Sequence, residues 1–455
     1  MTRHRRAQRL PDFRALPLED LVCAALFAFF AMQGAIPGIA PAQSLEMTAS
    51  APTGLTTLGG IGSQVLVNTV IVALLLRRPR LVLHQTLTVP CAALLAGLAV
   101  ASTFWSLDPA LTLRRSVPFA LAGLFGLYFA ARYSPARQLA ILRLAMIALA
   151  GATIGMVLLN PSIGLDHSPG HAADWQGVFT QKNACGRIMV LATAVILFAE
   201  HPGLRRPARL AALALFLFVL AMSGSRGAWI VEGALLALFG FCAIARRSGS
   251  AVRMVLAIAA PVAIAAAGVI QLIALPGLAL LVGRDGTLSG RTAIWAQVAH
   301  FILRRPLFGY GYDAFWRGMQ GPSFQVAAAV HFIVAHAHNG FLEIGIELGA
   351  AGLVLFAFSW LRAWRRLWPL WRLGAIGRIA WPIAILVLIA LYDLDENTLL
   401  IYNGLFWILY VAALSTIERL AGDQHHTRGP RPHAILAWRE SIGPDPSASF
   451  AQELP

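Results

Sequence analysis

Long apolar stretches alternate with short polar connections along most of the chain. Most of the stretches approach the roughly 20 residues that an α-helix needs to cross the hydrocarbon core of a bilayer, and a few are shorter. The pattern predicts an all-α, polytopic integral membrane protein with about twelve transmembrane helices. The predicted spans are 20–40, 60–76, 85–103, 117–131, 139–159, 184–200, 209–222, 227–245, 252–275, 338–361, 378–394 and 399–416.

The polar connections fall into two classes. Every second connection, on the same side as the N-terminus, is rich in arginine, which is the positive-inside bias of cytoplasmic loops. We therefore expect both termini in the cytoplasm. The groups suited to chemistry gather in the connections of the opposite, outer side. The arginine-rich connections lie at 77–80, 132–137, 205–209, 246–253 and 362–372.

These assignments divide the chain into five parts. The first apolar run follows a basic N-terminus in the manner of a signal sequence, but its length favours an uncleaved first helix. The parts are a basic cytoplasmic N-terminus (1–19), helices 1 to 9 (20–275), a long outer loop with an amphipathic helix (276–337), helices 10 to 12 (338–416) and a disordered cytoplasmic tail (417–455).

Composition agrees with the pattern and excludes two classes of protein. Of the 455 residues, 58% are hydrophobic and 13% are charged, whereas about a quarter of a soluble globule is charged. The net charge of +15 comes mostly from arginines in short loops, so we expect no nucleic-acid partner. The four cysteines lie within or at the edges of apolar runs without CxxC spacing, which argues against a disulfide or zinc framework.

Several arginines break the positive-inside rule because they lie in outer connections. Arg226 is the sharpest case, since a charge misplaced near the bilayer centre costs roughly 2.5 to 3.5 kcal/mol on insertion scales. We expect an anionic group to bind Arg226. The alternative is an interfacial arginine paired with a carboxylate such as Glu232. The other outer arginines are Arg114, Arg115, Arg284, Arg291, Arg304, Arg305 and Arg317.

Lys182 is the only lysine of the chain, and it is followed by Asn183 at the outer entry of a predicted helix. An ammonium is a compact point charge for a phosphate, whereas a guanidinium binds through a planar fork, so the two side chains are not equivalent. Lys182 is therefore a candidate ligand for phosphate. The alternative is that a chain biased toward arginine has kept one lysine by chance.

An amphipathic helix is predicted within the outer loop, with Ser289 as its N-cap. Ile294, Val298, Phe301 and Ile302 make one apolar face, which suits a position on the membrane surface. The helix ends at Arg305 and Pro306. With its arginines it would form a positively charged hood over the outer leaflet.

Three histidines, His331, His336 and His338, precede the tenth predicted span. They do not converge on one helix face and have no acidic or thiol partner in register, so we predict no metal site. An imidazole beside basic residues suits a general base for a hydroxyl group, and His338 is the candidate. The glycines of Gly345-x-x-x-Gly349 favour close helix packing. Glu343 and Glu347 either pair inside the bundle or orient the histidine.

Four motifs between about 177 and 352 resemble, in order, those of the O-antigen ligase and O-antigen polymerase superfamily. The element around Lys182 and Asn183 is most similar to the exopolysaccharide-polymerization branch. The motifs are Phe179-Thr-Gln-Lys182-Asn183-x-x-Gly186, Ser223-Gly-Ser-Arg226-Gly227-Ala, Gly290-Arg291 with Trp295, Pro306 and Gly309-x-Gly311, and His338-Asn339 followed by Gly349 and Gly352.

The resemblance implies a glycosyltransferase of the bacterial inner membrane whose active site faces the periplasm. Its donor would be an oligosaccharide linked to undecaprenyl diphosphate, and its acceptor a hydroxyl of a glycan, of lipid A core or of a protein, with no cofactor or metal. His338, Arg226 and Arg291 would be catalytic. Lys182, Asn183, Asn339, Arg284 and Arg305 would bind substrate.

Two alternatives stay open. The motifs do not separate a polymerase from a ligase, because the two differ in the acceptor. A transporter or flippase of lipid-linked oligosaccharide would also suit twelve helices with cytoplasmic termini. A transporter should show repeats and polar groups near the membrane midplane, whereas here the polar groups gather on one face.

Overall fold

The computed structural model describes residues 17–37, 54–167, 173–199, 205–255 and 291–427. These residues form helices, with no strand among them beyond one isolated bridge between Leu165 and Trp175. The helices are α1 Leu18–Ala31, α2 Gly54–Leu76, α3 Pro79–Thr88, α4 Pro90–Ala101, α5 Pro109–Arg132, α6 Pro135–Leu159, α7 Pro161–Gly164, α8 Lys182–Leu197, α9 Arg206–Met222, α10 Arg226–Arg247, α12 Arg291–Arg304, α13 Gly321–Val330, α14 Gly340–Arg372, α15 Ile376–Asp393 and α16 Leu405–Thr427.

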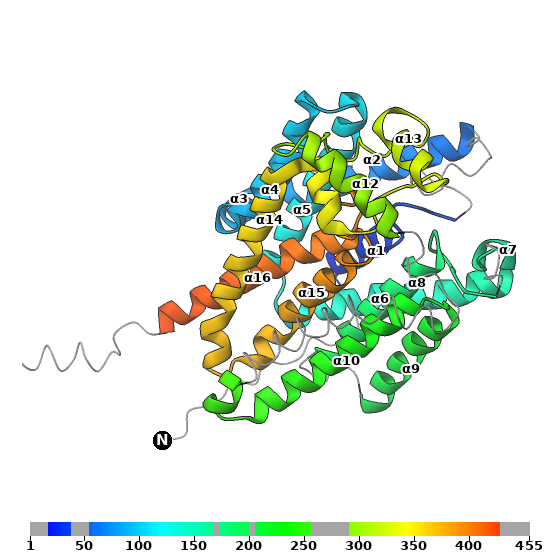
Figure 1. Cartoon of the computed structure of the whole chain (residues 1–455). Helices are drawn as coiled ribbons and strands as arrows, with labels where there is room; N and C mark the ends of the chain where they lie inside the picture. Colours follow the sequence, from blue (N-terminus) through cyan, green and yellow to red (C-terminus); the bar gives the residue numbers. More distant parts are fainter. Residues whose placement is uncertain (1–16, 38–53, 168–172, 200–204, 256–290, 428–455) are drawn as a thin grey trace, which may run out of the picture.

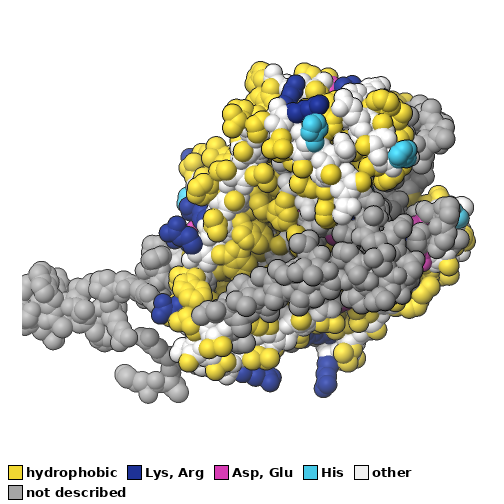
Figure 2. Space-filling view, viewed as in Figure 1, with side chains coloured by type: hydrophobic (Ala, Val, Ile, Leu, Met, Phe, Trp, Pro, Cys, Tyr) yellow, Lys and Arg dark blue, Asp and Glu magenta, His cyan; other side chains and the backbone are white. Residues whose placement is uncertain are grey.

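The predicted all-α membrane fold is confirmed in its class. Within the described residues, six helices are long and apolar enough to cross a bilayer, and a bent pair of helices would make a seventh span. Hydrophobic side chains cover much of the described surface in Figure 2, with Lys and Arg near the top and along the left and lower margins. The count of twelve spans stays a prediction, and most of the predicted span 252–275 lies outside the described residues.

Two predicted spans have different boundaries in the structure. The span 85–103 is broken, because α3 and α4 meet at an angle of 100°. Pro90 opens α4, and a proline disfavours helical geometry in the residue before it, here Val89. The span predicted to start at 399 begins instead at Leu405, since residues 394–404 form an outer loop.

The predicted tail from 417 starts later in the structure. Helix α16 continues to Thr427, and the side chains of Ile417 and Leu420 are buried in the core. The rest of that predicted tail lies outside the described residues.

The helices pack in two groups that meet along α15 and α16. Helix α8 is surrounded by α6, α9, α10 and α15, while α5 packs against α16, α4, α3 and α2. Close backbone approaches hold each group together. A Cβ at Gly186 of α8 would lie 2.9 Å from the Cβ atoms of Ala228 and Ser225, and a Cβ at Gly126 of α5 would lie 2.6 Å from the carbonyl oxygen of Ile408 in α16.

The two ends of the bundle differ in construction. In Figure 1 the C-terminal end of α16 and the turn between α14 and α15 lie at the lower left, away from α7 and α13 at the right. The arginine-rich connections occupy the first end. The second end is capped by α12, α13 and the segments around them, which pack onto the start of α14. It is called the outer end below.

The amphipathic helix predicted from Ser289 is present as α12, but its apolar face does not lie on a surface. Ile294, Val298 and Phe301 are fully buried. They belong to a separate small core of the outer end, formed with Tyr310, Phe315, Trp316, Val326, Val334, Ala337 and Ile346. The prediction of a surface-lying face is wrong because the segments that follow α12 fold back and cover it.

Gly349 allows a loop, not a second helix, to approach α14. Its φ of +64° breaks the helical geometry inside α14. The backbone of the loop satisfies the groups freed by this break: the N–H groups of Ala350 and Ala351 donate to the carbonyl oxygens of Pro306 (2.7 Å) and Leu307 (3.0 Å). At Gly349 the predicted helix–helix packing is thus replaced by helix–loop packing, whereas Gly345 of the same motif packs against Ile302 of helix α12.

Candidate active site

The segment before α14 holds two histidines in a fixed conformation. The backbone of Ala337, between His336 and His338, is bound on both sides: its N–H donates to Oε2 of Glu343 (2.7 Å), and its carbonyl oxygen accepts from the indole N–H of Trp295 (3.0 Å). Glu343, only 1% exposed, also accepts from the indole N–H of Trp316 at 2.6 Å. Glu343 therefore holds the histidine segment, and its side chain also contacts that of Glu347, so the two expected roles occur together.

His338 has an unusual backbone conformation. Its φ of +50° lies in the left-handed region, where a residue other than glycine is strained. Such strain persists only where the surroundings impose it, and it is frequent at functional sites. Here Asn339 caps α14 by accepting from the N–H of Leu342 (3.0 Å) and donates to the carbonyl oxygen of Leu394 (3.3 Å). Asn339, predicted to bind substrate, thus ties the histidine segment to the loop after α15.

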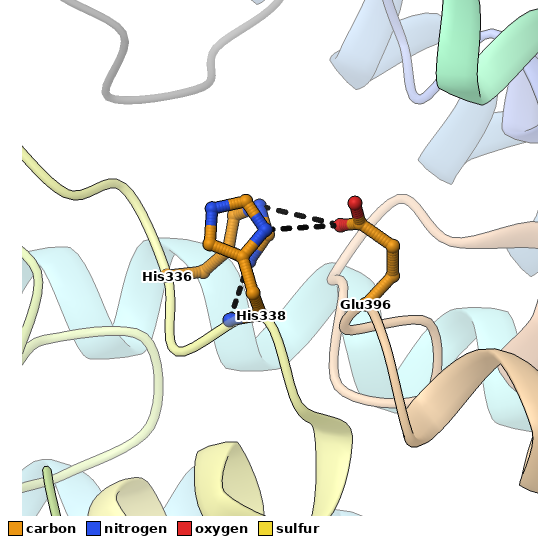
Figure 3. Close-up of side chains that lie close together, drawn as sticks. All are labelled: His336, His338 and Glu396. Atoms are coloured by element: carbon orange, nitrogen blue, oxygen red, sulfur yellow. Dashed lines mark hydrogen bonds and ion pairs between the residues drawn. The ribbon is translucent and has the colours of Figure 1, made fainter. Parts of the chain in front are cut away.

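That loop supplies a carboxylate which the sequence analysis did not pair with the histidines. Oε2 of Glu396 lies 3.5 Å from Nδ1 of His338 and 3.7 Å from Nε2 of His336, and the two imidazole rings are 4.0 Å apart. Figure 3 shows both rings directed at the same carboxylate oxygen. The reasoning that these histidines lack an acidic partner is therefore wrong, because the partner comes from a different helix connection.

The hydrogen bonds indicate how the two rings hold their protons. The N–H of His338 donates to Nδ1 of His336 (3.1 Å), so in a neutral His336 the proton is on Nε2, facing Glu396. Nδ1 of His338 is buried and has only Glu396 nearby. A proton on this Nδ1 leaves Nε2 of His338 with a free lone pair, which is the form that accepts a proton.

The charges of the cluster are unequal. Burial lowers the pKa of His336 to about 4, and the positive charges of Arg187 and Arg291 act in the same direction, so this ring is neutral at neutral pH. Burial alone would raise the pKa of Glu396. The hydrogen bond from His338 and the positive charges around it outweigh burial and hold that pKa at about 2. Glu396 is thus ionised at neutral pH and is suited to orient an imidazole.

His336, His338 and Glu396 could also hold a metal ion by position, since their ligand atoms all lie within 4.8 Å of one another. Coordination through Nε2 of His336 would need the proton to move to Nδ1, which would break the hydrogen bond from the N–H of His338. The hydrogen bonds of the described residues therefore suit a proton-transfer cluster better than a metal centre.

Arg291 binds the same loop. Its guanidinium forms an ion pair with Asp395 and lies 3.4 Å from Oε1 of Glu396. The structure thus brings together two of the predicted catalytic residues, His338 and Arg291, through Glu396. With two carboxylate neighbours, Arg291 holds Glu396 in place as well as adding positive charge.

Arg226, the third predicted catalytic residue, is the first residue of α10 and is exposed. The next residue, Gly227, would carry a Cβ only 3.2 Å from Oδ2 of Asp395, which places the start of α10 beside the Arg291 loop. Within the described residues Arg226 has no ion pair. The alternative pairing with Glu232 is absent, since both carboxylate oxygens of Glu232 are buried without a hydrogen-bond partner among them.

Lys182 and Asn183 support the turn that precedes Arg226. The ammonium of Lys182 binds Oδ2 of Asp174 at 2.6 Å. A Cβ at Gly224, whose φ is +61°, would collide with Asp174, so this carboxylate packs directly on the turn. Asn183 accepts a hydrogen bond from the hydroxyl of Ser225 (3.0 Å). These contacts give both residues a structural role, and substrate binding by either stays a prediction.

The other predicted substrate-binding residues are not brought to the cluster. Arg305 follows the far end of α12, about 20 Å along the helix from Arg291 at a rise of 1.5 Å per residue, and its guanidinium lies 4.8 Å from the centre of the Tyr310 ring. Arg284 lies outside the described residues.

Three residues of the site were missed as candidates: Glu396, His336 in its pairing role, and Arg187. Glu396 belongs to the acidic outer connection 392–397, and Arg187 directly follows the Lys182 motif. The acidic connection and the position of Arg187 are both visible in the sequence, but neither shows which connections lie next to each other in the folded protein. That depends on the packing of α15 against both α8 and α14.

Comparisons with known proteins match the segment of the chain that contains this site. Residues 211–357 match the family model described as O-Antigen ligase, and this segment contains Arg226, Arg291 and His338. The exopolysaccharide production protein ExoQ of Rhizobium meliloti is 32% identical over 274 residues, which are 56% of this chain and 60% of the relative.

A protein of Rickettsia prowazekii, named provisionally as a polysaccharide ligase, is 36% identical over 69 residues, which are 14% of this chain and 17% of that relative. The matches thus span less than two thirds of the length of either relative. The resemblance predicted from the motifs is confirmed: residues 211–357 match the O-Antigen ligase model, and the chain is similar to the exopolysaccharide production protein ExoQ.

Proposed function

We propose that the protein is a membrane glycosyltransferase that transfers or polymerises an oligosaccharide linked to undecaprenyl diphosphate. The observation that carries the proposal is the His338 ring, held in a strained conformation against an ionised Glu396 and beside the arginines of the outer end. The domain match and the name of the ExoQ relative support a substrate that is a polysaccharide precursor.

The proposed reaction is a single displacement. The acceptor hydroxyl attacks the anomeric carbon, its proton passes to Nε2 of His338, and the bond between that carbon and the diphosphate oxygen breaks. The diphosphate leaves with the electron pair. Attack from the face opposite the leaving group inverts the anomeric centre. A positioned base of this kind contributes about 10² to 10⁴-fold to a rate.

Glu396 acts as a positioning residue in this scheme. Its carboxylate faces Nδ1 of His338, favours the tautomer with a free Nε2 and stabilises the imidazolium that forms. Arg226 and Arg291 stabilise the negative charge that develops on the departing diphosphate. The scheme needs neither a metal ion nor a nucleotide sugar.

The site is proposed to face the periplasm of a bacterial inner membrane, with both termini in the cytoplasm. The positive-inside bias supports this orientation, since the arginine-rich connections lie at the end of the bundle away from His338. Undecaprenyl diphosphate would approach from the outer leaflet, and the acceptor hydroxyl, whether of a glycan, of lipid A core or of a protein, from the aqueous side.

Reconstitution into liposomes with a purified undecaprenyl-diphosphate oligosaccharide tests the proposal. Lengthening of the glycan indicates a polymerase, and its appearance on an added acceptor indicates a ligase. Movement of the lipid-linked oligosaccharide across the bilayer without any new glycosidic bond would replace the proposal with the flippase alternative. Addition of a chelator should leave the rate unchanged.

A further inference from the structure

Arg187 is a nearly buried arginine that the reaction scheme above does not use. It lies on α8, one turn from its start, and only 7% of it is exposed. Within the described residues it forms no ion pair or hydrogen bond, and its guanidinium lies 5.9 Å from the centre of the Phe406 ring. Its nitrogens are not among the fully buried polar atoms without a partner, so the exposed part of the side chain is the guanidinium.

The surroundings of Arg187 place it at the active site. The neighbouring Gly186 packs against Ser225 and Ala228, directly beside Arg226. The charge of Arg187 acts on His336 and on Glu396, which lie on two other segments of the outer end. The guanidinium therefore lies within electrostatic reach of the histidine segment and of the loop after α15, on a helix that packs against the start of α10.

The balance of charges leaves this part of the outer end positive. Three arginines, Arg187, Arg226 and Arg291, lie in it, while Asp395 and Glu396 are both neighbours of Arg291. Asp393 and Glu232 lie deeper: the unpartnered carboxylate oxygens of both are fully buried and cannot meet a ligand as they stand. Arg187 and Arg226 form no ion pair with a carboxylate among the described residues, although the charge of Arg187 acts at longer range on Asp393 and Glu396.

Burying a guanidinium without a partner is costly, so folding alone does not favour an arginine at this position. An arginine whose aliphatic part is buried and whose planar guanidinium N–H groups are accessible is well suited to bind a phosphate. We infer that Arg187 is a ligand of the diphosphate group of the lipid-linked donor and forms, with Arg226, a two-arginine clamp on the leaving group. This inference rests on the proposed function and assigns the innermost contact of that site.

The test is binding of undecaprenyl diphosphate to the full-length protein in detergent, with undecaprenyl monophosphate as a second probe. For Arg187→Met we expect binding of the diphosphate lipid to weaken at least tenfold, since each charge-assisted hydrogen bond is strong. Arg187→Lys keeps the charge but loses the fork, so its loss should be smaller. Arg304→Met removes an exposed arginine of α12 and should change binding less than twofold.

Thermal unfolding of the same variants separates ligand binding from a structural role. If Arg187 serves binding, Arg187→Met should melt at the wild-type temperature or above it, because an unpaired buried cation has been removed. A lower melting temperature, or binding within twofold of the wild type for Arg187→Met, would overturn the inference. Failure of the wild-type protein itself to bind the diphosphate lipid would instead count against the proposed function.

Discussion

The two ends of the helix bundle both carry arginines that pair with carboxylates, and at the outer end these include Arg115 with Asp313 (2.9 Å) and Arg317 with Asp108 (3.4 Å). Two arginines of the outer end differ from them. At the end that carries the arginine-rich connections, five ion pairs join helices among the described residues: Arg132 with Glu19 (3.0 Å), Arg137 with Asp20, Arg362 with Glu418 (2.5 Å), Arg366 with Glu418 (3.0 Å) and Arg378 with Asp423 (3.5 Å). At the outer end, Arg187 and Arg226 have no carboxylate partner among the described residues, and the carboxylate Glu396 is directed at two histidines.

The comparison distinguishes arginines that determine membrane topology from arginines that we propose bind an anionic ligand. Paired arginines at the inner end satisfy the positive-inside bias and join neighbouring helices without any further partner. Arg187 is nearly buried without an ion pair among the described residues, which is unfavourable for folding, and the proposed anionic substrate would offset this cost. The ends can be compared directly by changing matched residues in each.

His338→Ala should have the largest effect. Loss of the base should lower glycan transfer in reconstituted liposomes by about 10² to 10⁴-fold, while the protein remains folded in the membrane. His331→Ala is the matched control, since His331 is exposed and also has a left-handed backbone, with a φ of 66°. If the His338→Ala variant makes polymer of unchanged length and yield, His338 is not the catalytic base.

Glu396→Gln should have the next largest effect. The amide cannot stabilise the imidazolium of His338, and we expect kcat to fall by about 100-fold with little change in KM. Glu396→Asp should recover part of the loss. If Glu396→Gln raises KM and leaves kcat unchanged, the carboxylate binds substrate and does not position the base.

Arg226→Lys should reduce the use of the donor by about tenfold, because the ammonium keeps the charge but loses the forked contact with a phosphate. The measurement is kcat/KM for the lipid-linked oligosaccharide. Wild-type kinetics in this variant would show that Arg226 has a structural role.

Asp423→Asn, at the inner end, should have the smallest effect. The pair with Arg378 is exposed, and such pairs contribute about 0 to 1 kcal/mol to stability. We expect transfer within twofold of the wild type and a nearly unchanged melting temperature. A loss of transfer comparable with that of Arg226→Lys would remove the distinction between the two ends.

The helices were largely predictable from the sequence, because a bilayer requires long apolar segments and most of these segments occur as helices. The exceptions have local causes. The break at Val89 follows from Pro90, and the late start of α16 reflects the outer loop 394–404, whose Leu399 and Leu400 are buried like core residues. An apolar loop of this kind cannot be told from a helix by hydropathy.

The site was predictable in part. His338 and Arg291 were identified from motifs, and the structure places them around one carboxylate. Glu396 and Arg187 could not be assigned, because their roles depend on how α15 packs against both α8 and α14. Hydropathy also could not show that the face of α12 is covered, since a face buried under a loop and a face buried in lipid have the same composition.

The sidedness of the two ends is the most direct test of the account. Single cysteines at Arg226, at His331 and at Arg378 can be labelled in intact cells with a maleimide that does not cross the inner membrane, in a background lacking Cys91. We predict that the cysteines at 226 and 331 react from the periplasm and that the cysteine at 378 reacts only after the membrane is opened. Labelling of positions 226 and 331 from opposite sides would contradict a single outer site.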